Sequence, residues 1–231
     1  MIKPVYDITP FSLLDYPGKV AAIIWFAGCN MRCAYCYNPE IVLGKGRRSF
    51  EEALDFLETR KTLLEAVVLS GGECTLHKSL PAFAAAIKQK GYLVKLDTNG
   101  THPELLEVLI GQGLVDYVAI DFKAPANKYS MVTGASHYDS FVKTLQLLVN
   151  TSLPFEVRTT VHSALLQQGD IEQMCQVLKE HNYTGNYYLQ YALNNVAMLA
   201  DLPDSVGRIQ MDASRSINGV PIVERMLEGA V

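Results

Sequence analysis

The chain has 231 residues, of which 49% are hydrophobic and 19% are charged. This length and composition fit one sizeable α/β domain, or two small ones, with a full hydrophobic core. The net charge of −4 gives no sign of non-specific nucleic-acid binding, and the longest apolar run, 20–27, is too short to span a bilayer. These two observations predict that the protein has neither a nucleic-acid nor a membrane partner. Residues 1–10 do not resemble a secretory signal, so we expect a cytoplasmic protein.

Six apolar runs rich in β-branched residues predict strands along the chain. The runs are 20–27, 66–70, 92–97, 116–121, 155–161 and 187–191. Nearly continuous apolar runs of this length are typical of parallel strands that are covered on both faces.

Helical patterns lie between these runs. Ser49 and Glu52 predict a capping box at the start of one helix, and Pro103 is expected in the first turn of another. Apolar stripes at helical spacing fall within 53–57, 80–87, 105–110, 141–149 and 171–178. The alternation predicts about six βα units with a parallel sheet and right-handed crossovers.

A complete eight-unit barrel needs about 250 residues, so an incomplete barrel is favoured. We predict an α/β fold, a partial (β/α)6 TIM-like barrel that is laterally open. It would be a single domain over 1–231, with an N-terminal extension at 1–19, the barrel at 20–200 and a C-terminal tail at 201–231. A doubly wound open sheet is the runner-up. The GVPIV run at 219–223 is a candidate for a short extra strand.

Polar and glycine-rich residues follow the predicted strands, where either fold would place its active residues. In chain order, they are the cysteine loop at 28–36, Ser70-Gly71-Gly72-Glu73, Asp97-Thr98-Asn99-Gly100, Asp121-Phe122-Lys123, Arg158 on the fifth strand and Gln190 on the sixth.

Three of the five cysteines fall within eight positions, spaced as Cys29-x3-Cys33-x2-Cys36. Structural zinc usually takes four ligands in two separated pairs, and a 4Fe–4S cluster is usually held by four cysteines. A cluster held by three thiolates leaves one iron open to coordinate a reactant. The clustering also favours a reducing compartment over a disulfide framework.

This cysteine spacing resembles the cluster signature of the radical S-adenosylmethionine (SAM) enzymes. Tyr35 holds the aromatic position before the third cysteine, and Gly71-Gly72-Glu73 is similar to the GGE motif of that family. More narrowly, four segments resemble activases of glycyl-radical enzymes: DYPG at 15–18, CYNP at 36–39, DTNG at 97–100 and DFK at 121–123. The narrower likeness is to anaerobic ribonucleoside-triphosphate reductase activating proteins, with pyruvate formate-lyase activating enzyme as a relative.

The resemblance implies an enzyme in which one 4Fe–4S cluster, ligated by three cysteines, reductively cleaves SAM. The resulting 5′-deoxyadenosyl radical would abstract hydrogen from a glycine of a large glycyl-radical enzyme. Beyond the cluster loop, only Cys74 and Cys175 remain, too few for the ferredoxin-type insert of many other activases. An external one-electron donor such as flavodoxin or ferredoxin is therefore expected.

The resemblance also implies roles for individual residues. Cys29, Cys33 and Cys36 would bind the cluster. The other expected cofactor-binding residues are Tyr35, Tyr37, Gly71, Gly72, Glu73, Asp97, Asp121, Lys123, Arg158 and Gln190. Glycines allow close backbone approach to the methionine moiety, and Glu73 can accept from its amino group. Lys123 and Arg158 would pair with the methionine carboxylate or the ribose, and Asp97, Thr98 and Asp121 would bind Na+ or K+.

At two positions the sequence departs from the family pattern: Tyr37 stands where the family usually has histidine, and Cys74 where it often has proline. These departures bear on which partner protein the chain would act on. Cys74 and Cys175 are expected to pack as small hydrophobes. One alternative is a small-molecule radical SAM enzyme such as 7-carboxy-7-deazaguanine synthase. Another is a metal-binding or interaction module without enzymatic activity, which would contain zinc.

Overall fold

The structure is a computed structural model of the chain and describes residues 3–211 and 213–226. The chain forms two units. Unit 1 comprises the described parts of Met1–Asn30, Asn38–Thr98 and His102–Ala119. Unit 2 comprises the described parts of Met31–Tyr37, Asn99–Thr101 and Ile120–Val231. Strand β5, Tyr117–Asp121, contributes its first three residues to unit 1 and its last two to unit 2.

The strands of unit 1 follow one another in sequence order. They are β1 (Val5–Ser12), β2 (Ala21–Phe26), β3 (Ala66–Gly71) and β4 (Leu93–Thr98). Strand β1 pairs with β2 in an antiparallel way, whereas β2, β3 and β4 are parallel. The parallel strands are mostly buried, as expected for strands covered on both faces.

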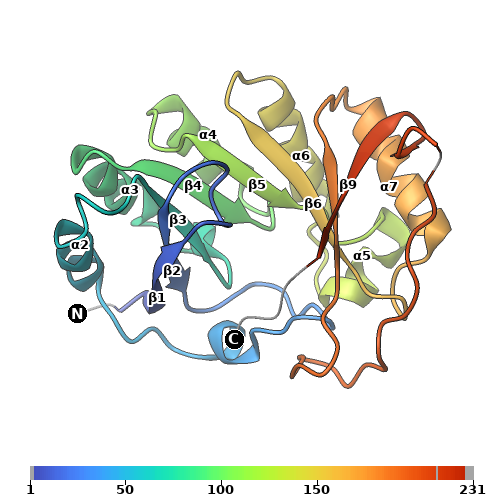
Figure 1. Cartoon of the computed structure of the whole chain (residues 1–231), viewed down its shortest axis with the longest axis horizontal. Helices are drawn as coiled ribbons and strands as arrows, with labels where there is room; N and C mark the ends of the chain where they lie inside the picture. The colour runs from blue at the N-terminus through green and yellow to red at the C-terminus, as the bar shows by residue number, and fades with distance from the viewer. Residues whose placement is uncertain (1–2, 212, 227–231) are drawn as a thin grey trace. The chain divides into compact units, whose positions relative to one another are not determined.

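The helices of unit 1 are α1 (Pro39–Leu43), α2 (Phe50–Glu58), α3 (Leu80–Gln89) and α4 (Pro103–Gly111), with a 3₁₀ turn at Cys74–Leu76. The predicted capping box is confirmed: the Ser49 side chain accepts from the Glu52 amide, and the Glu52 carboxylate accepts from the Ser49 amide. The rings of Phe50 and Phe83 stack with centroids 4.1 Å apart, which packs α2 beside α3 (Figure 1).

Unit 2 contains β6 (Phe155–Val161), β7 (Tyr187–Tyr191), β8 (Ser216–Ile217) and β9 (Val220–Met226). Its helices are α5 (Ala126–Thr133), α6 (Tyr138–Val149) and α7 (Gln168–Glu180). The pairs β6–β7 and β7–β9 are parallel, whereas β8 and β9 form a hairpin. Asn218 and Gly219 both have positive φ, the backbone that a tight two-residue hairpin turn requires.

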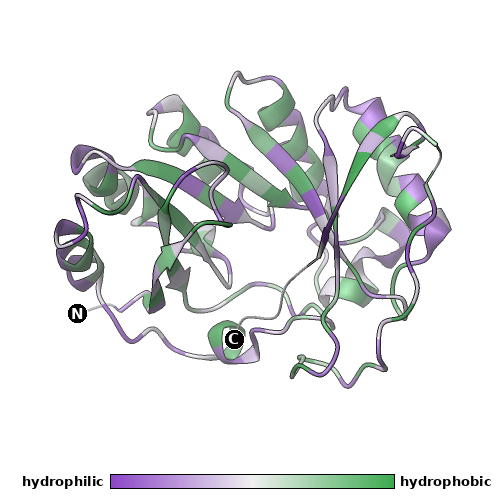
Figure 2. Cartoon of the chain, in the orientation of Figure 1, coloured by the Kyte–Doolittle hydropathy of each residue, from purple (hydrophilic) through white to green (hydrophobic). Residues whose placement is uncertain are grey.

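The mixed α/β class with parallel strands is confirmed. The hydrogen-bonded strand order is β1-β2-β3-β4-β5-β6-β7-β9-β8, with β1 and β8 at the edges, so the sheet is open rather than closed. Figure 2 shows hydrophobic residues along β3 and a mixture of hydrophobic and hydrophilic residues on α7. Among the residues that the structure describes, no helix has the length and apolar character needed to cross a membrane.

All six predicted strands form, and so does the extra strand suspected in the GVPIV run, as part of β9. Strand β1, α1 and α5 were not predicted. β1 lies in the stretch assigned to an N-terminal extension, and after its first two residues it is only partly buried and mixed in polarity. Its place depends on pairing with β2, where the Trp25 indole donates to the Thr9 hydroxyl at 2.8 Å.

Candidate functional site

The glycine pair of the GGE motif fastens the end of β3 to the start of the cysteine loop within unit 1. The Gly72 amide donates to the Phe26 carbonyl at 2.9 Å, and the Glu73 amide donates to the Gly28 carbonyl at 2.8 Å. A Cβ atom at Gly72 would overlap the Gly28 carbonyl oxygen, and Gly71 has a φ of +120°. Neither position accepts a side chain without movement of the backbone.

Glu73 is buried, and hydroxyl groups hold its carboxylate in place. Its Oε1 atom accepts from the Thr75 amide at 3.1 Å, from the Thr75 hydroxyl at 2.5 Å and from the Thr98 hydroxyl at 2.8 Å. The Thr75 hydroxyl also lies 2.9 Å from Nδ1 of His102. The sequence analysis missed Thr75, although its position two residues after Glu73 suits a local hydrogen bond to that side chain.

The three clustered cysteines differ in their burial. Cys29 belongs to unit 1, where it is half-buried. Cys33 and Cys36 belong to unit 2, where Cys33 is buried and Cys36 half-buried. Across the described ranges 3–211 and 213–226, no three His, Cys, Asp or Glu side chains are arranged as ligands of a single metal ion.

Backbone hydrogen bonds hold the cysteine loop of unit 2 at several points. The Cys36 amide donates to the Cys33 carbonyl at 2.9 Å, and the Leu199 amide donates to the Cys36 carbonyl at 2.9 Å. The amides of Arg32 and Ala34 donate to the end of α5 at 2.7 and 3.0 Å. Helix α5 and the segment around residue 199, both missed by the sequence analysis, therefore shape this loop.

Tyr35 is buried between the two cysteines of unit 2, with 3% of its surface exposed. Its hydroxyl has no hydrogen-bond partner within the described part of the chain. Burial raises the pKa of this hydroxyl well above its ordinary range, so it is a proton donor at neutral pH. A buried hydroxyl without a partner is costly, which marks a place for a polar ligand atom.

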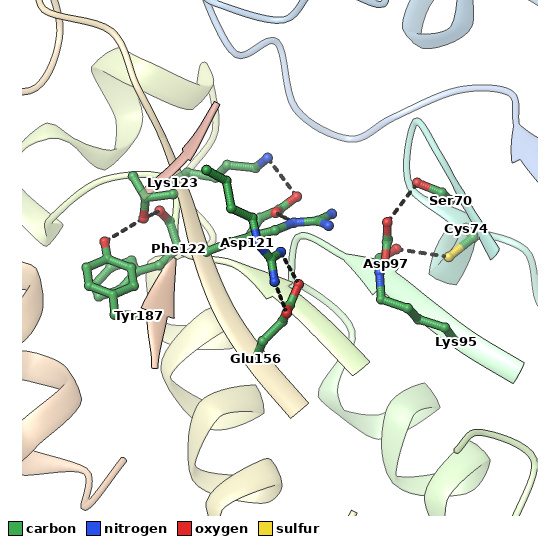
Figure 3. Close-up of polar contacts among 12 residues, drawn as sticks. Ser70, Cys74, Lys95, Asp97, Asp121, Phe122, Lys123, Glu156 and Tyr187 are labelled. Atoms are coloured by element: carbon green, nitrogen blue, oxygen red, sulfur yellow. Dashed lines mark hydrogen bonds and ion pairs between the residues drawn. The ribbon is translucent and has the colours of Figure 1, made fainter. Parts of the chain in front are cut away.

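Asp121, Lys123 and Arg158 form one ion cluster in unit 2. Arg158 Nε lies 2.5 Å from Asp121 Oδ1, and Lys123 Nζ lies 2.9 Å from Asp121 Oδ2 (Figure 3). Burial would raise the pKa of Asp121, but the two cations outweigh it and lower that pKa to about 2. Burial by itself would lower the pKa of Lys123, but Asp121, Tyr35 and Cys33 together outweigh it and raise that pKa well above its ordinary range. The sequence analysis placed each of these residues on or directly after a predicted strand, but it did not predict that they would pair with one another.

Asp97 lies near the end of β4 and has its own cation in unit 1. Lys95 Nζ lies 2.6 Å from Asp97 Oδ1, and the Ser70 hydroxyl donates to Asp97 Oδ2 at 3.3 Å (Figure 3). Cys74 Sγ lies 3.4 Å from the Asp97 carbonyl oxygen. Lys95 was not among the predicted site residues because an isolated lysine in a strand carries no sequence signal for burial.

The other residues discussed in the sequence analysis are Tyr37, Gln190 and the two cysteines outside the cysteine loop, and they differ in exposure. Tyr37 is exposed, and Gln190 is half-buried on β7, where its register partner on β9 is Arg225. Cys74 and Cys175 are fully buried, and burial raises the pKa of both thiols, that of Cys175 to about 12. Both therefore pack as small hydrophobes, as expected.

The sequence analysis also missed a clamp between β6 and β9. Arg225 makes two hydrogen bonds of 2.8 Å to the two carboxylate oxygens of buried Glu156, and its guanidinium lies 3.6 Å from the ring centroid of Tyr188. Glu156 and Arg158 share one face of β6 because side chains alternate along a strand. Strand β9 therefore stabilises the strand that carries Arg158.

The family model of the Radical SAM superfamily matches residues 23–182. The "Putative glycyl-radical enzyme activating enzyme MJ1227" of Methanocaldococcus jannaschii is 37% identical over 182 residues, which cover 76% of this chain and 75% of that protein. The pyruvate formate-lyase-activating enzyme of Clostridium pasteurianum is 29% identical, over 62% of this chain and 63% of its own.

Other relatives differ in reaction or share the fold alone. The 7-carboxy-7-deazaguanine synthase of Aquifex aeolicus is 34% identical over 84 residues, which are 36% of this chain and 38% of that protein. SuiB of Streptococcus suis, solved with bound S-adenosylmethionine, aligns with a TM-score of 0.65 over 88% of this chain and 51% of its own, at 11% identity. This chain thus spans about half of that solved chain, and the likeness shows a common fold.

Proposed function

Because this chain belongs to the Radical SAM superfamily, an enzyme superfamily whose members use a 4Fe–4S cluster and SAM, we propose that it activates a glycyl-radical enzyme. The observation that carries the proposal is the 37% identity to the "Putative glycyl-radical enzyme activating enzyme MJ1227" across three quarters of both chains. The substrate would be a glycine in a large partner protein, as in activases of anaerobic ribonucleotide reductase. The electron donor would be a separate protein such as flavodoxin or ferredoxin, in a reducing cytoplasm.

The donor set of this chain fits a three-cysteine cluster. Cys29, Cys33 and Cys36 lie within eight consecutive positions of the chain. In a cluster each thiolate binds its own iron, so the cysteines need not converge on a single ion. The backbone bonds from Gly72 and Glu73 to β2 and the cysteine loop hold the GGE turn beside Cys29. We propose that these three cysteines ligate one cluster and that the fourth iron is left for SAM.

The remaining residues of unit 1 would hold the methionine end of SAM. The Thr75 and Thr98 hydroxyls orient the Glu73 carboxylate, which would accept a charge-assisted hydrogen bond from the SAM amino group. The absence of side chains at Gly71 and Gly72 lets the GGE turn lie against the backbone of Phe26 and Gly28, which would hold this turn beside the ligand. When bound, the cluster supplies the electron that cleaves SAM into methionine and the radical that takes hydrogen from glycine.

Unit 2 would supply two cationic side chains and the aromatic ring of Tyr35 to the SAM site. Asp121 holds Lys123 and Arg158 in place, and these would pair with the methionine carboxylate or the ribose. Tyr35 would pack beside the adenine and donate its unpaired hydroxyl to the ligand. Tyr37 and Gln190 are weaker members of the proposed set. The whole chain, 1–231, would act as one radical SAM domain.

The decisive test is anaerobic reconstitution with iron and sulfide. Reductant-dependent formation of 5′-deoxyadenosine would then be measured with and without candidate glycyl-radical enzymes. We expect a glycyl doublet in the electron paramagnetic resonance spectrum of the partner. Turnover of SAM without a doublet in any partner, together with product formation from a small molecule, would contradict the activase function.

A second candidate is a small-molecule radical SAM enzyme of the 7-carboxy-7-deazaguanine synthase type. It is favoured by the 34% identity over 84 residues to such a synthase. It predicts substrate binding without any partner protein. A colourless reconstituted protein that contains zinc and does not cleave SAM would refute both candidates.

A further inference from the structure

Lys95 is a cation inside unit 1 to which the proposed function assigns no role. Its side chain is 3% exposed, and that of Asp97 is 9% exposed. The ammonium lies 2.6 Å from Asp97 Oδ1, while Ser70 donates to Oδ2 (Figure 3). An almost buried carboxylate needs a positive partner, and here a side chain of the same strand provides it.

The strand geometry explains why the ammonium reaches Asp97. Side chains alternate along a strand, so Leu93, Lys95 and Asp97 share one face of β4. Leu93 packs against the apolar cluster of Tyr16, Ala21, Ile23, Ala66 and Val68. Val68 on β3 is the register partner of Lys95. The aliphatic stem of Lys95 therefore lies beside apolar residues, and its charged end meets the carboxylate near the end of β4.

Asp97 is joined to the Glu73 carboxylate through its neighbour. Thr98, the next residue, donates to Glu73 Oε1 at 2.8 Å. The Glu73 carboxylate thus contacts the residue next to Asp97. A change in the position or charge of Asp97 would move the hydroxyl that orients Glu73.

The two carboxylates among the predicted Na+ or K+ ligands therefore have side-chain cations already. Asp97 is paired with Lys95 in unit 1, and Asp121 is paired with Lys123 and Arg158 in unit 2. We propose that the Lys95 ammonium is a built-in replacement for a monovalent metal ion at Asp97, so that this chain folds and binds SAM without added Na+ or K+. The SAM-binding half of this statement depends on the proposed function, whereas the folding half does not.

The test compares the wild-type protein with Lys95→Ala and Lys95→Met in two kinds of buffer. One contains tetramethylammonium as its cation, which is too large to enter a buried site. The other contains K+, Na+ or NH4+ at the same ionic strength, about 0.1 M. Melting temperature is measured on the cluster-free protein, and SAM affinity on the reconstituted protein. The matched control is Lys88→Ala, which removes a lysine paired with Asp116 at 2.6 Å on the outer helix α3.

For wild type we expect the same melting temperature and the same SAM affinity in every buffer. For Lys95→Ala we expect SAM affinity to fall about tenfold in tetramethylammonium, and small cations to restore much of it together with the melting temperature. Lys88→Ala should respond equally to all cations.

A wild-type protein that requires Na+ or K+ for either property overturns the proposal, even if the Lys95 variants do not fold. So does a folded Lys95→Ala protein that small cations fail to rescue, because Lys95 would then be a structural residue. Lys95→Met fills the space of the ammonium, so it should show no rescue by small cations. The melting measurement needs neither cofactor nor partner, so failure of the activase function remains distinguishable.

Discussion

Replacing Asp121 with asparagine should destabilise unit 2 in a pH-dependent way. The change keeps the size of the side chain but leaves Arg158 and Lys123, at 2.5 and 2.9 Å, without their negative partner. In the folded protein the pKa of Asp121 is lowered from 3.8 to about 2. At about 1.4 kcal/mol per pKa unit, this difference corresponds to about 2 kcal/mol of stability.

The direction of the pH dependence of stability follows from the direction of the pKa change. A lowered pKa in the folded state contributes stability that is present above pH 4 and is lost as the pH falls towards about 2. The free energy of unfolding of wild type should therefore exceed that of Asp121→Asn by about 2 to 3 kcal/mol at pH 7. The two values should converge as the pH approaches 2.

Urea unfolding of the cluster-free protein at several pH values measures this difference. The exposed carboxylate of Asp201 offers a matched control, Asp201→Asn, which should follow the wild-type curve. A difference between wild type and Asp121→Asn that stays constant from pH 7 to pH 3 would refute the reasoning, because the charge of Asp121 would then not be its source.

Three further predictions concern the cofactor residues. Each of three single substitutions should abolish 5′-deoxyadenosine formation: Cys29→Ala, Cys33→Ala and Cys36→Ala. Wild-type yield from any one of these variants would disprove the three-ligand cluster. Glu73→Gln should weaken SAM binding by about 10-fold or more while the iron content stays unchanged, since a charged acceptor becomes neutral. Unchanged SAM affinity, measured by calorimetry, would show that Glu73 does not bind the SAM amino group. Gly72→Ala should lower the melting temperature and the iron content together, because its Cβ would overlap the Gly28 carbonyl; normal iron loading would show that the turn can move.

Parts of the site that depend on pairing between distant segments could not be predicted from residue types. The sequence placed Glu73, Asp97 and Asp121 at strand ends, and each lies at or within two residues of one, whereas Arg158 lies in the middle of β6. It did not indicate which cation each acid would take. Lys95 shows the difficulty: a lysine within an apolar strand pattern is ordinarily expected at the surface, whereas this one is buried against Asp97.

The sequence by itself determined the six apolar strands, the helices between them and the three-cysteine loop. These features are local, because apolar periodicity, capping residues and cysteine spacing act over a few neighbouring residues. Only the tertiary structure decided that β1 and β9 join the sheet, that Thr98 binds Glu73 and that Arg158 binds Asp121. Each of these depends on strand register and on side chains brought together from segments far apart in the chain, which short-range patterns do not encode.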